Sequence, residues 1–127
     1  MLLKNSEIYN IHQMLIDNFM NEERYFPAKV NYIIQKNIKT LLTTVQELES
    51  VRLSIIQHYG QLNENNDGGI IASENIQLAN NELNDLANIE QEINILFLTF
   101  KDIEEIEFTP AQMGAILFMI KEDEGEE

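Results

Sequence analysis

The 127-residue sequence contains no cysteine. A chain without cysteine has no disulfide framework, no thiolate metal site and no cysteine nucleophile. Long apolar runs are also missing, since Ile95–Leu98 and Ala115–Ile120 are far shorter than the roughly 20 residues that cross a bilayer as a helix. The segment Met1–Asn5 turns polar before the core of a signal peptide could form. We therefore expect a cytoplasmic protein that folds without disulfides.

Basic residues are scarce, and the scarcity is confined to one half of the chain. The formal charge is −14, yet residues 1–60 carry six bases and six acids. Residues 61–127 carry sixteen acids against only Lys101 and Lys121. Such a half is repelled by phosphate backbones and anionic lipid, so we expect no direct binding of nucleic acid or membrane.

The acidic half suggests a partner of the opposite charge. Either its carboxylates meet a protein with a basic surface, or they only keep a small domain in solution. If they form a contact, we expect it to involve Glu90, Glu92, Asp102, Glu104, Glu105 and Glu107, the last three of which lie in a connector that should be exposed.

Proline and glycine are few, and neither occurs between Pro27 and Gly60. Proline suits the first turn of a helix, and glycine suits the left-handed residue just past its end. The intervening segment therefore predicts one long helix. Its apolar residues recur at alternating steps of four and three, interrupted by Arg52. This seam consists of Ile34, Ile38, Leu41, Val45, Leu48, Ile55 and Tyr59.

Three shorter helices are expected around the long one. The first follows a short strand at Leu2–Leu3 and is capped by Asn5 or Ser6, the next is capped by Ser73, and the last begins at Thr109–Pro110. The predicted fold is α+β and mostly helical, with a long central helix, three shorter helices and a minimal β element. The length fits a single domain, residues 1–121, followed by an acidic tail, residues 122–127.

Two local packing features are also expected. Tyr25 and Phe26 precede Pro27, and apolar residues at such a position commonly form a hydrophobic staple. Gly114 would allow the last helix to approach its neighbour closely. The buried stripe of that helix would consist of Met113, Ile116, Leu117 and Ile120.

The segment Ile89–Phe100 permits two interpretations. A helical rhythm continues through it, but a helix would place Glu90 on the apolar seam. Its β-branched and aromatic residues favour a strand, and Asn88 offers a stop for the preceding helix. We favour the strand. Its partner would be Leu2–Leu3 or Ile70–Ile71.

Residues 63–74 have the spacing of an EF-hand calcium loop. Asn63, Asn65 and Asp67 occupy the first, third and fifth positions, and Glu74 occupies the twelfth. The first position of such a loop is normally Asp, and the sequence contains no second EF-hand loop to pair with this one. The Asn-Asp-Gly-Gly stretch is equally typical of a hairpin turn. A weak calcium-modulated binder is therefore an alternative, while the principal expectation is that no metal is bound.

No motif of an enzyme is present. His12 and His58 lie on different predicted helices, and neither has a carboxylate at ligand spacing. The sequence has no phosphate-binding glycine loop, no nucleophile elbow and no basic cluster interleaved with aromatic residues. We expect a protein without enzymatic activity and without a cofactor.

Five short segments together resemble a known family. They are Leu3–Tyr9, Pro27–Val30, Lys36–Ile38, Tyr59–Gly60 and Phe108–Pro110. The family consists of small acidic proteins of unknown function encoded by phages and prophages of Gram-positive bacteria. The resemblance implies a phage origin and assigns no catalytic residue.

Together with the charge distribution, this resemblance suggests a non-enzymatic interaction protein in the cytoplasm of a host cell. One concrete form is an anti-defence or host-takeover inhibitor whose carboxylates occupy a basic groove of a nucleic-acid-handling protein. The alternative is a virion-assembly or tail accessory protein, a homo-oligomer that uses the long helix as its seam.

Overall fold

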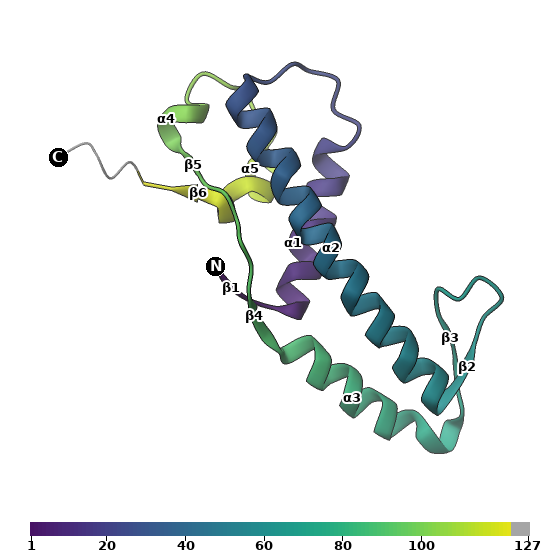
Figure 1. Ribbon diagram of the computed structural model, residues 1–127. Helices are drawn as coiled ribbons and strands as arrows, with labels where there is room; N and C mark the ends of the chain where they lie inside the picture. Colours follow the sequence, from purple (N-terminus) through teal and green to yellow (C-terminus); the bar gives the residue numbers. More distant parts are fainter. Residues whose placement is uncertain (123–127) are drawn as a thin grey trace.

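The fold is organised around one long helix, α2, which runs from Ala28 to Tyr59 between Pro27 and Gly60. A computed structural model describes residues 1–122, and Figure 1 shows α2 crossing most of the molecule. The fold is α+β and mostly helical, as the sequence predicts. Of the expected acidic tail 122–127, all but Glu122 lies outside the described residues. Every helix within residues 1–122 is too short or too polar to span a bilayer.

The apolar seam of α2 faces the protein's own interior. Ile34, Ile38, Leu41 and Leu48 are buried, as the spacing predicts. Arg52, which interrupts the seam, forms an ion pair with Glu49 at 2.7 Å. Because its apolar side chains pack within the chain, the seam is not an open surface for a second copy.

Helix α1, Asn5–Phe19, follows strand β1, Leu2–Lys4. The expected cap at Asn5 or Ser6 was wrong, because the capping residue is Lys4, whose backbone N–H donates to Glu7 Oε1 at 2.8 Å. Asn5 is instead the first helical residue and is buried. Its Nδ2 donates to the carbonyl oxygen of Leu86 at 2.8 Å. Its side chain therefore joins distant segments rather than closing a helix end.

The chain leaves α2 through a β-hairpin, with strand β2, Gly60–Leu62, paired antiparallel to strand β3, Gly69–Ile71. Gly60 was expected to be left-handed, but its φ of −165° is extended. Glycine is required there for a different reason, since a Cβ would collide with the carbonyl oxygen of Ile70 on the opposite strand. The proposed pairing of Ile70–Ile71 with the segment Ile89–Phe100 was therefore wrong.

After the hairpin the chain runs back along α2 (Figure 1). A 3₁₀ turn, η1, covers Ser73–Asn75 and leads into α3, Ile76–Asn88. Ser73 thus lies inside the helical turn instead of capping it, whereas the predicted stop at Asn88 is confirmed. Ala79 is buried against α2, while Leu83 and Leu86 are half-buried.

The segment Ile89–Phe100 is neither the predicted continuous strand nor a helix. It holds strand β4, Glu90–Glu92, which pairs antiparallel with β1 as expected for Leu2–Leu3. It also holds strand β5, Leu98–Thr99, which pairs parallel with strand β6, Ile120–Lys121. The residues between these strands have no strand partner.

The side chain of Asn37 supplies that missing partner. Its Oδ1 accepts from the backbone N–H of Leu96 and its Nδ2 donates to the carbonyl of the same residue, both at 2.9 Å. A primary amide reproduces the donor and acceptor that a neighbouring strand would offer. Helix α2 therefore holds the irregular segment in place.

The C-terminal part contains the short helix α4, Phe100–Ile103, then α5, Pro110–Ile116, and a 3₁₀ turn, η2, over Leu117–Met119. The predicted start at Thr109–Pro110 is confirmed, since Thr109 accepts from the N–H of Gln112 at 3.0 Å.

Two expectations about this last helix were wrong. Leu117 is 54% exposed, because the 3₁₀ turn shifts the buried side and brings Met119 inward. Gly114 makes no close approach, since a Cβ there would lie 4.0 Å from the nearest atom, Met14 Cε.

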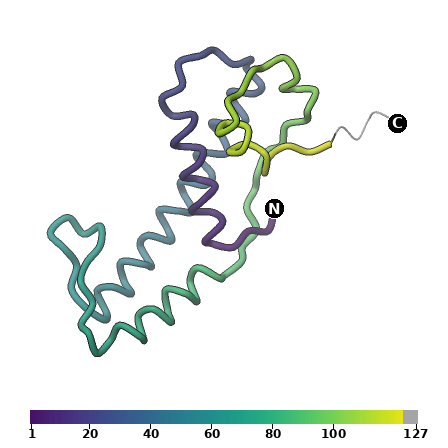
Figure 2. Tube along the Cα trace, turned by 180° about the vertical axis from the view of Figure 1, so that it is seen from behind, coloured from purple at the N-terminus to yellow at the C-terminus, as the bar shows by residue number. Residues whose placement is uncertain are grey.

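The main hydrophobic core joins α1, the first half of α2 and residues 93–119. Phe19, Phe26 and Phe108 form part of it, with ring centroids 5.6–6.2 Å apart. Tyr25 does not share in the expected staple and is 87% exposed. Residues 46–89, here called the distal arm, comprise the end of α2, the hairpin and α3. Figure 2 shows the arm extending away from the rest.

Candidate interaction surface

The six acids expected at a contact lie in two separate places. Glu90 and Glu92 belong to β4, beside the start of α1. The other four lie in α4 and in the loop that follows it, near the start of α2 (Figure 1). The structure therefore does not bring the six into one patch.

Asp102 is occupied within the chain. Its Oδ2 accepts from the backbone N–H and the hydroxyl of Thr99, at 2.9 and 3.1 Å, and its Oδ1 accepts from Lys29 Nζ at 3.0 Å. The backbone hydrogen bond of Thr99 is the largest cause that lowers the pKa of this carboxyl. Asp102 serves as a helix cap that also fixes α4 to α2.

Of the two acids on β4, one is also engaged. Glu92 accepts from the amino group of Met1 at 2.6 Å, whereas the side chain of Glu90 is exposed. A partner would have to compete with Met1 for Glu92.

The remaining three acids form what we call the acidic loop, residues 104–107. Glu104, Glu105 and Glu107 are exposed, and none of their carboxylates joins an ion pair within residues 1–122. Ile103 is buried and Ile106 is half-buried, so the loop is anchored to the core between its charges. The carboxylates are free to meet an external cation.

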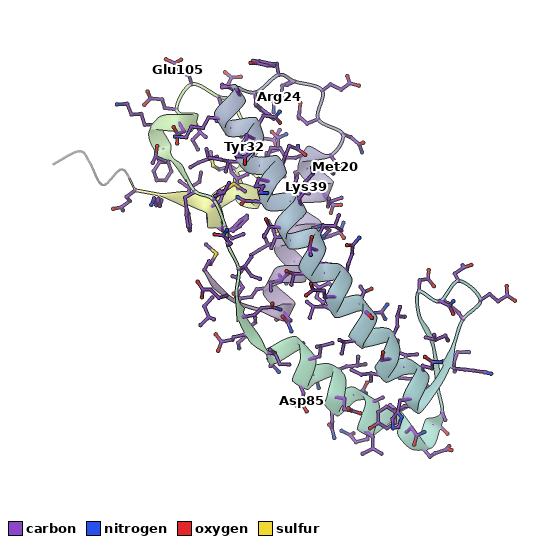
Figure 3. The ribbon with its side chains drawn as sticks, viewed as in Figure 1. Met20, Arg24, Tyr32, Lys39, Asp85 and Glu105 are labelled. Atoms are coloured by element: carbon purple, nitrogen blue, oxygen red, sulfur yellow. The ribbon has the colours of Figure 1, made fainter. Side chains whose placement is uncertain are left out.

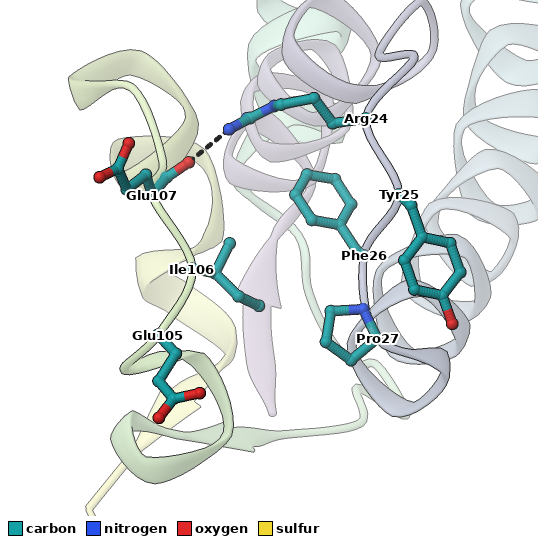
Figure 4. A pocket seen from close by; sticks show the side chains of 7 residues that line it. All are labelled: Arg24, Tyr25, Phe26, Pro27, Glu105, Ile106 and Glu107. Atoms are coloured by element: carbon teal, nitrogen blue, oxygen red, sulfur yellow. Dashed lines mark hydrogen bonds between the residues drawn. The ribbon is translucent and has the colours of Figure 1, made fainter.

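A hollow of about 400 Å³ lies where the acidic loop meets the chain before α2 (Figure 4). Phe26 and Ile106 line its apolar part, while the exposed ring of Tyr25 lies at its edge. The lining residues are Arg24, Tyr25, Phe26, Pro27, Glu105, Ile106 and Glu107.

Arg24 ties the two sides of this hollow together. Its Nη1 donates to the carbonyl oxygen of Glu107, the contact drawn in Figure 4, and its Nη2 donates to Gln112 Oε1 at 2.7 Å. Its guanidinium also lies 5.3 Å from the centroid of the Phe26 ring. Arg24 therefore acts as a brace, and its charge is directed away from the carboxylates of the acidic loop.

Gln112 completes the brace. Its Nε2 donates to Glu22 Oε2 at 2.7 Å and to the carbonyl oxygen of Asn18 at 3.2 Å. Hydrogen bonds from Arg24, followed by that of Gln112, lower the pKa of Glu22 to about 2. The segment before α2 and the acidic loop are thus held in one fixed arrangement.

Sequence reasoning predicted the acidic loop but missed Arg24, Tyr25 and Gln112 as parts of the same site. More than eighty residues separate Arg24 from Glu107. A tyrosine two residues before a proline also carries no local signal that distinguishes it from a staple residue. Only the folded arrangement brings the aromatic ring and the acids together.

The possible calcium loop folds as the turn of the hairpin. Asn63 Nδ2 donates to Asp67 Oδ1 at 2.7 Å, and the N–H of Asp67 donates to Asn63 Oδ1 at 3.1 Å. Asn65 is exposed in the turn, and Glu74 lies in η1. In the described part of the chain, no three or more His, Cys, Asp or Glu residues are grouped to hold a metal ion.

The two histidines lie apart from the acidic loop. His12 is in α1, and its Nε2 is buried without a hydrogen-bond partner, so burial lowers the pKa of the imidazole. His58 stands edge-on to Tyr59 in the last turn of α2, with ring centroids 4.6 Å apart.

No protein-family model, curated protein or solved structure matches the chain. The resemblance of the five segments to the phage family stays a prediction.

Proposed function

We propose that the protein is a non-enzymatic interaction protein of phage origin that binds a basic surface of a host nucleic-acid-handling protein. It would act in the host cytoplasm as an anti-defence or host-takeover inhibitor. The observation that carries this proposal is the acidic loop, whose three exposed carboxylates lack an internal cation; two of its acids, Glu105 and Glu107, line a hollow with an exposed tyrosine.

The chemistry of the acidic loop suits a groove that normally holds nucleic acid. Such a groove presents Lys and Arg side chains to phosphates, and carboxylates can pair with the same groups. Tyr25 adds a large amphipathic ring, a residue type enriched at the centres of protein interfaces. Charge would speed association and the aromatic contact would slow dissociation.

The fixed arrangement of the two sides of the hollow favours binding of a partner. The brace formed by Arg24 and Gln112 holds both sides of the hollow before a partner arrives. Less conformational entropy is then lost on binding. The rival proposal of an oligomer seam has less support, because Ile34, Ile38 and Leu41 are buried in the protein's own core.

The proposal is tested by capture from a lysate of a Gram-positive host on immobilised protein, with mass spectrometry of the bound fraction. The triple variant Glu104→Gln, Glu105→Gln, Glu107→Gln is compared with the wild type. We expect a nucleic-acid-handling protein that the wild type retains and the variant loses. Added DNA should compete for it.

A control variant with the same change in net charge is Asp17→Asn, Glu47→Gln, Glu122→Gln, whose three exposed sites are scattered over the surface. It should retain the captured protein. For the purified partner, association rates of the wild type and the acidic-loop variant should differ most at low salt and converge at high salt. Equal loss with both variants, or equal rates at low salt, would exclude the acidic loop as the contact.

A further inference from the structure

The distal arm has a thin core. Only Leu48, Ile56 and Ala79 are buried in it, and none of them belongs to the main hydrophobic core. The arm nevertheless exposes several large apolar side chains. These are Val51, Ile70, Ile76, Leu78 and Ile89, with exposed fractions between 46% and 80%.

Part of this apolar surface is concave. A groove of about 230 Å³ lies between the end of α2 and α3, with Val51 and Ile55 on one side and Leu86 and Ile89 on the other. Val51 and Ile89 are 46% and 53% exposed, so the groove is open to an apolar side chain from outside. Clustered apolar side chains in a groove mark an interaction site more often than scattered ones do.

The rim of the groove is acidic. Glu82 and Asp85 line it, and they lie between Leu78 on α3 and Ile89 just past the helix end, at steps of four, three and four. Such spacing places all four on one side of a helix. Asp85 is labelled on α3 in Figure 3. One edge of α3 therefore offers apolar anchors and carboxylates together.

The charge of the whole arm reinforces that of the rim. Its single Lys or Arg residue, Arg52, is already paired with Glu49. Neither Glu82 nor Asp85 joins an ion pair with any residue from 1 to 122. The carboxylates of the arm are those of Glu47, Glu49, Glu64, Asp67, Glu74, Glu82 and Asp85.

We infer that this groove is a second docking site, which seats a basic amphipathic helix of a partner protein. The apolar side of that helix packs on Val51 and Ile89, and its Lys or Arg residues pair with Glu82 and Asp85. A helix fits because the groove itself runs between two helices. Leu78 on α3 and Ile89 just past its end lie eleven positions apart, about 16 Å at the rise of a helix, which matches three turns of a docked helix. The inference does not depend on the acidic loop.

The test uses a synthetic amphipathic helix built of Leu and Lys, titrated into the ¹⁵N-labelled protein. A scrambled peptide of the same composition serves as the control. We expect the amphipathic peptide alone to shift the amide signals of the groove. The double variant Val51→Thr, Ile89→Thr should weaken binding roughly tenfold, because it removes apolar contact at two anchors.

Two further variants separate the contribution of the groove from that of exposed apolar surface elsewhere, and the contribution of apolar contact from that of charge. Leu42→Thr, Leu117→Thr removes exposed apolar surface elsewhere and should bind like the wild type. Glu82→Gln, Asp85→Asn should weaken binding mainly at low salt. This charge variant keeps the inference testable if the threonine variant does not fold.

Three results would overturn the inference. One is equal binding of the scrambled peptide or no binding of either peptide. Another is a loss of binding with the acidic-loop variant but not with the groove variants. The third is concentration-dependent light scattering of the protein alone that Val51→Thr, Ile89→Thr abolishes, since the groove would then be occupied by a second copy. If the groove binds no peptide, the acidic-loop proposal is unaffected, because the two sites are tested with different variants.

Discussion

Three buried amides hold together segments that are far apart in the sequence. Asn5 joins α1 to Leu86 and Gln91, Asn37 joins α2 to Leu96, and Gln112 joins α5 to the end of α1. Buried polar groups are tolerated only when their partners are complete. These residues therefore fix how the chain packs more specifically than apolar contacts can.

Replacing one of these amides should be costly. We expect Asn37→Leu to lower the free energy of unfolding by about 2–4 kcal/mol, because the N–H and the carbonyl of Leu96 lose their partner in a part-buried place. Urea denaturation measures the change. Asn31→Leu, at an exposed position of the same helix, is the matched control and should be nearly neutral. Equal stabilities of the two variants would show that Asn37 is not a structural bridge.

His12 should make stability depend on pH. Burial lowers the pKa of its imidazole below the ordinary value of 6.5, so the unfolded chain takes up a proton first as the pH falls. The stability from neutral His12 is complete above pH 6.5 and is lost as the pH falls towards the folded pKa. Chemical denaturation between about pH 5.5 and 7.5 should show this slope in the wild type and a flatter one in His12→Leu. Parallel slopes would rule out His12 as the cause.

The buried amides also show why residue-level prediction was incomplete. In the sequence, a buried Asn within an amphipathic pattern cannot be distinguished from an exposed Asn, because its hydrogen-bond partner lies on another element. Asn5, Asn37 and Thr109 lie in the segments on which the predicted resemblance rests, and each has a structural role here. The residues of those segments therefore indicate a shared fold more than a shared binding site.

At the scale of elements, the sequence predicts best where the signal is local. Pro27 and the pair Thr109–Pro110 mark helix starts through their own backbone chemistry, and both predictions are confirmed. Prediction failed for the segment 89–100, whose pairing depends on β1, β6 and Asn37. It failed for the conformation of Gly60, which depends on the strand opposite.

The hairpin glycines provide a test at this scale. A Cβ at Gly60 or Gly69 would collide with the backbone of the opposite strand, whereas a Cβ at Gly68 would lie 3.7 Å from the nearest atom, Asn63 Nδ2. We expect Gly60→Ala and Gly69→Ala to open the hairpin and to destabilise the protein by more than about 1 kcal/mol. Gly68→Ala should be tolerated. Thermal unfolding measures the loss of stability, and amide exchange of Gln61 measures the opening of the hairpin. Equal effects of the three substitutions would contradict the prediction.

At the scale of the whole molecule, the protein has two parts of unequal packing. Leu41 lies in the main core, whereas Leu48 is buried but does not belong to that core. We expect amide exchange in α3 and the hairpin to be faster than in α1 and the first half of α2. Hydrogen exchange under native conditions measures the difference.

Charged substitutions should separate the two parts. Leu41→Asp buries an unpaired charge in the core and should unfold the protein, at a cost of several kcal/mol. Leu48→Asp should release the arm and leave the core signals dispersed in amide spectra. Global unfolding by both substitutions would show that arm and core form one cooperative unit.

The interaction surface could be predicted from the sequence only in part, because it depends on contacts between segments far apart in the chain. Charge composition alone predicted an acidic contact, which stays a prediction at Glu104, Glu105 and Glu107; these residues are exposed and unpaired within residues 1–122. Composition could not show that Asp102 and Glu92 have internal partners, nor that Tyr25 lies beside the loop. Such facts follow from long-range packing.

The layout of arm and core has a kinetic consequence. Arm contacts join near neighbours, since Arg52 and Asp67 are 15 residues apart, whereas Asn5 and Gln91 in the core region are 86 apart. Short loops close faster and at a lower entropic cost than long ones. We therefore expect the arm to form early during refolding, and the ends of the chain to meet late and set the overall rate. The part expected to assemble first is then also the part expected to open most readily.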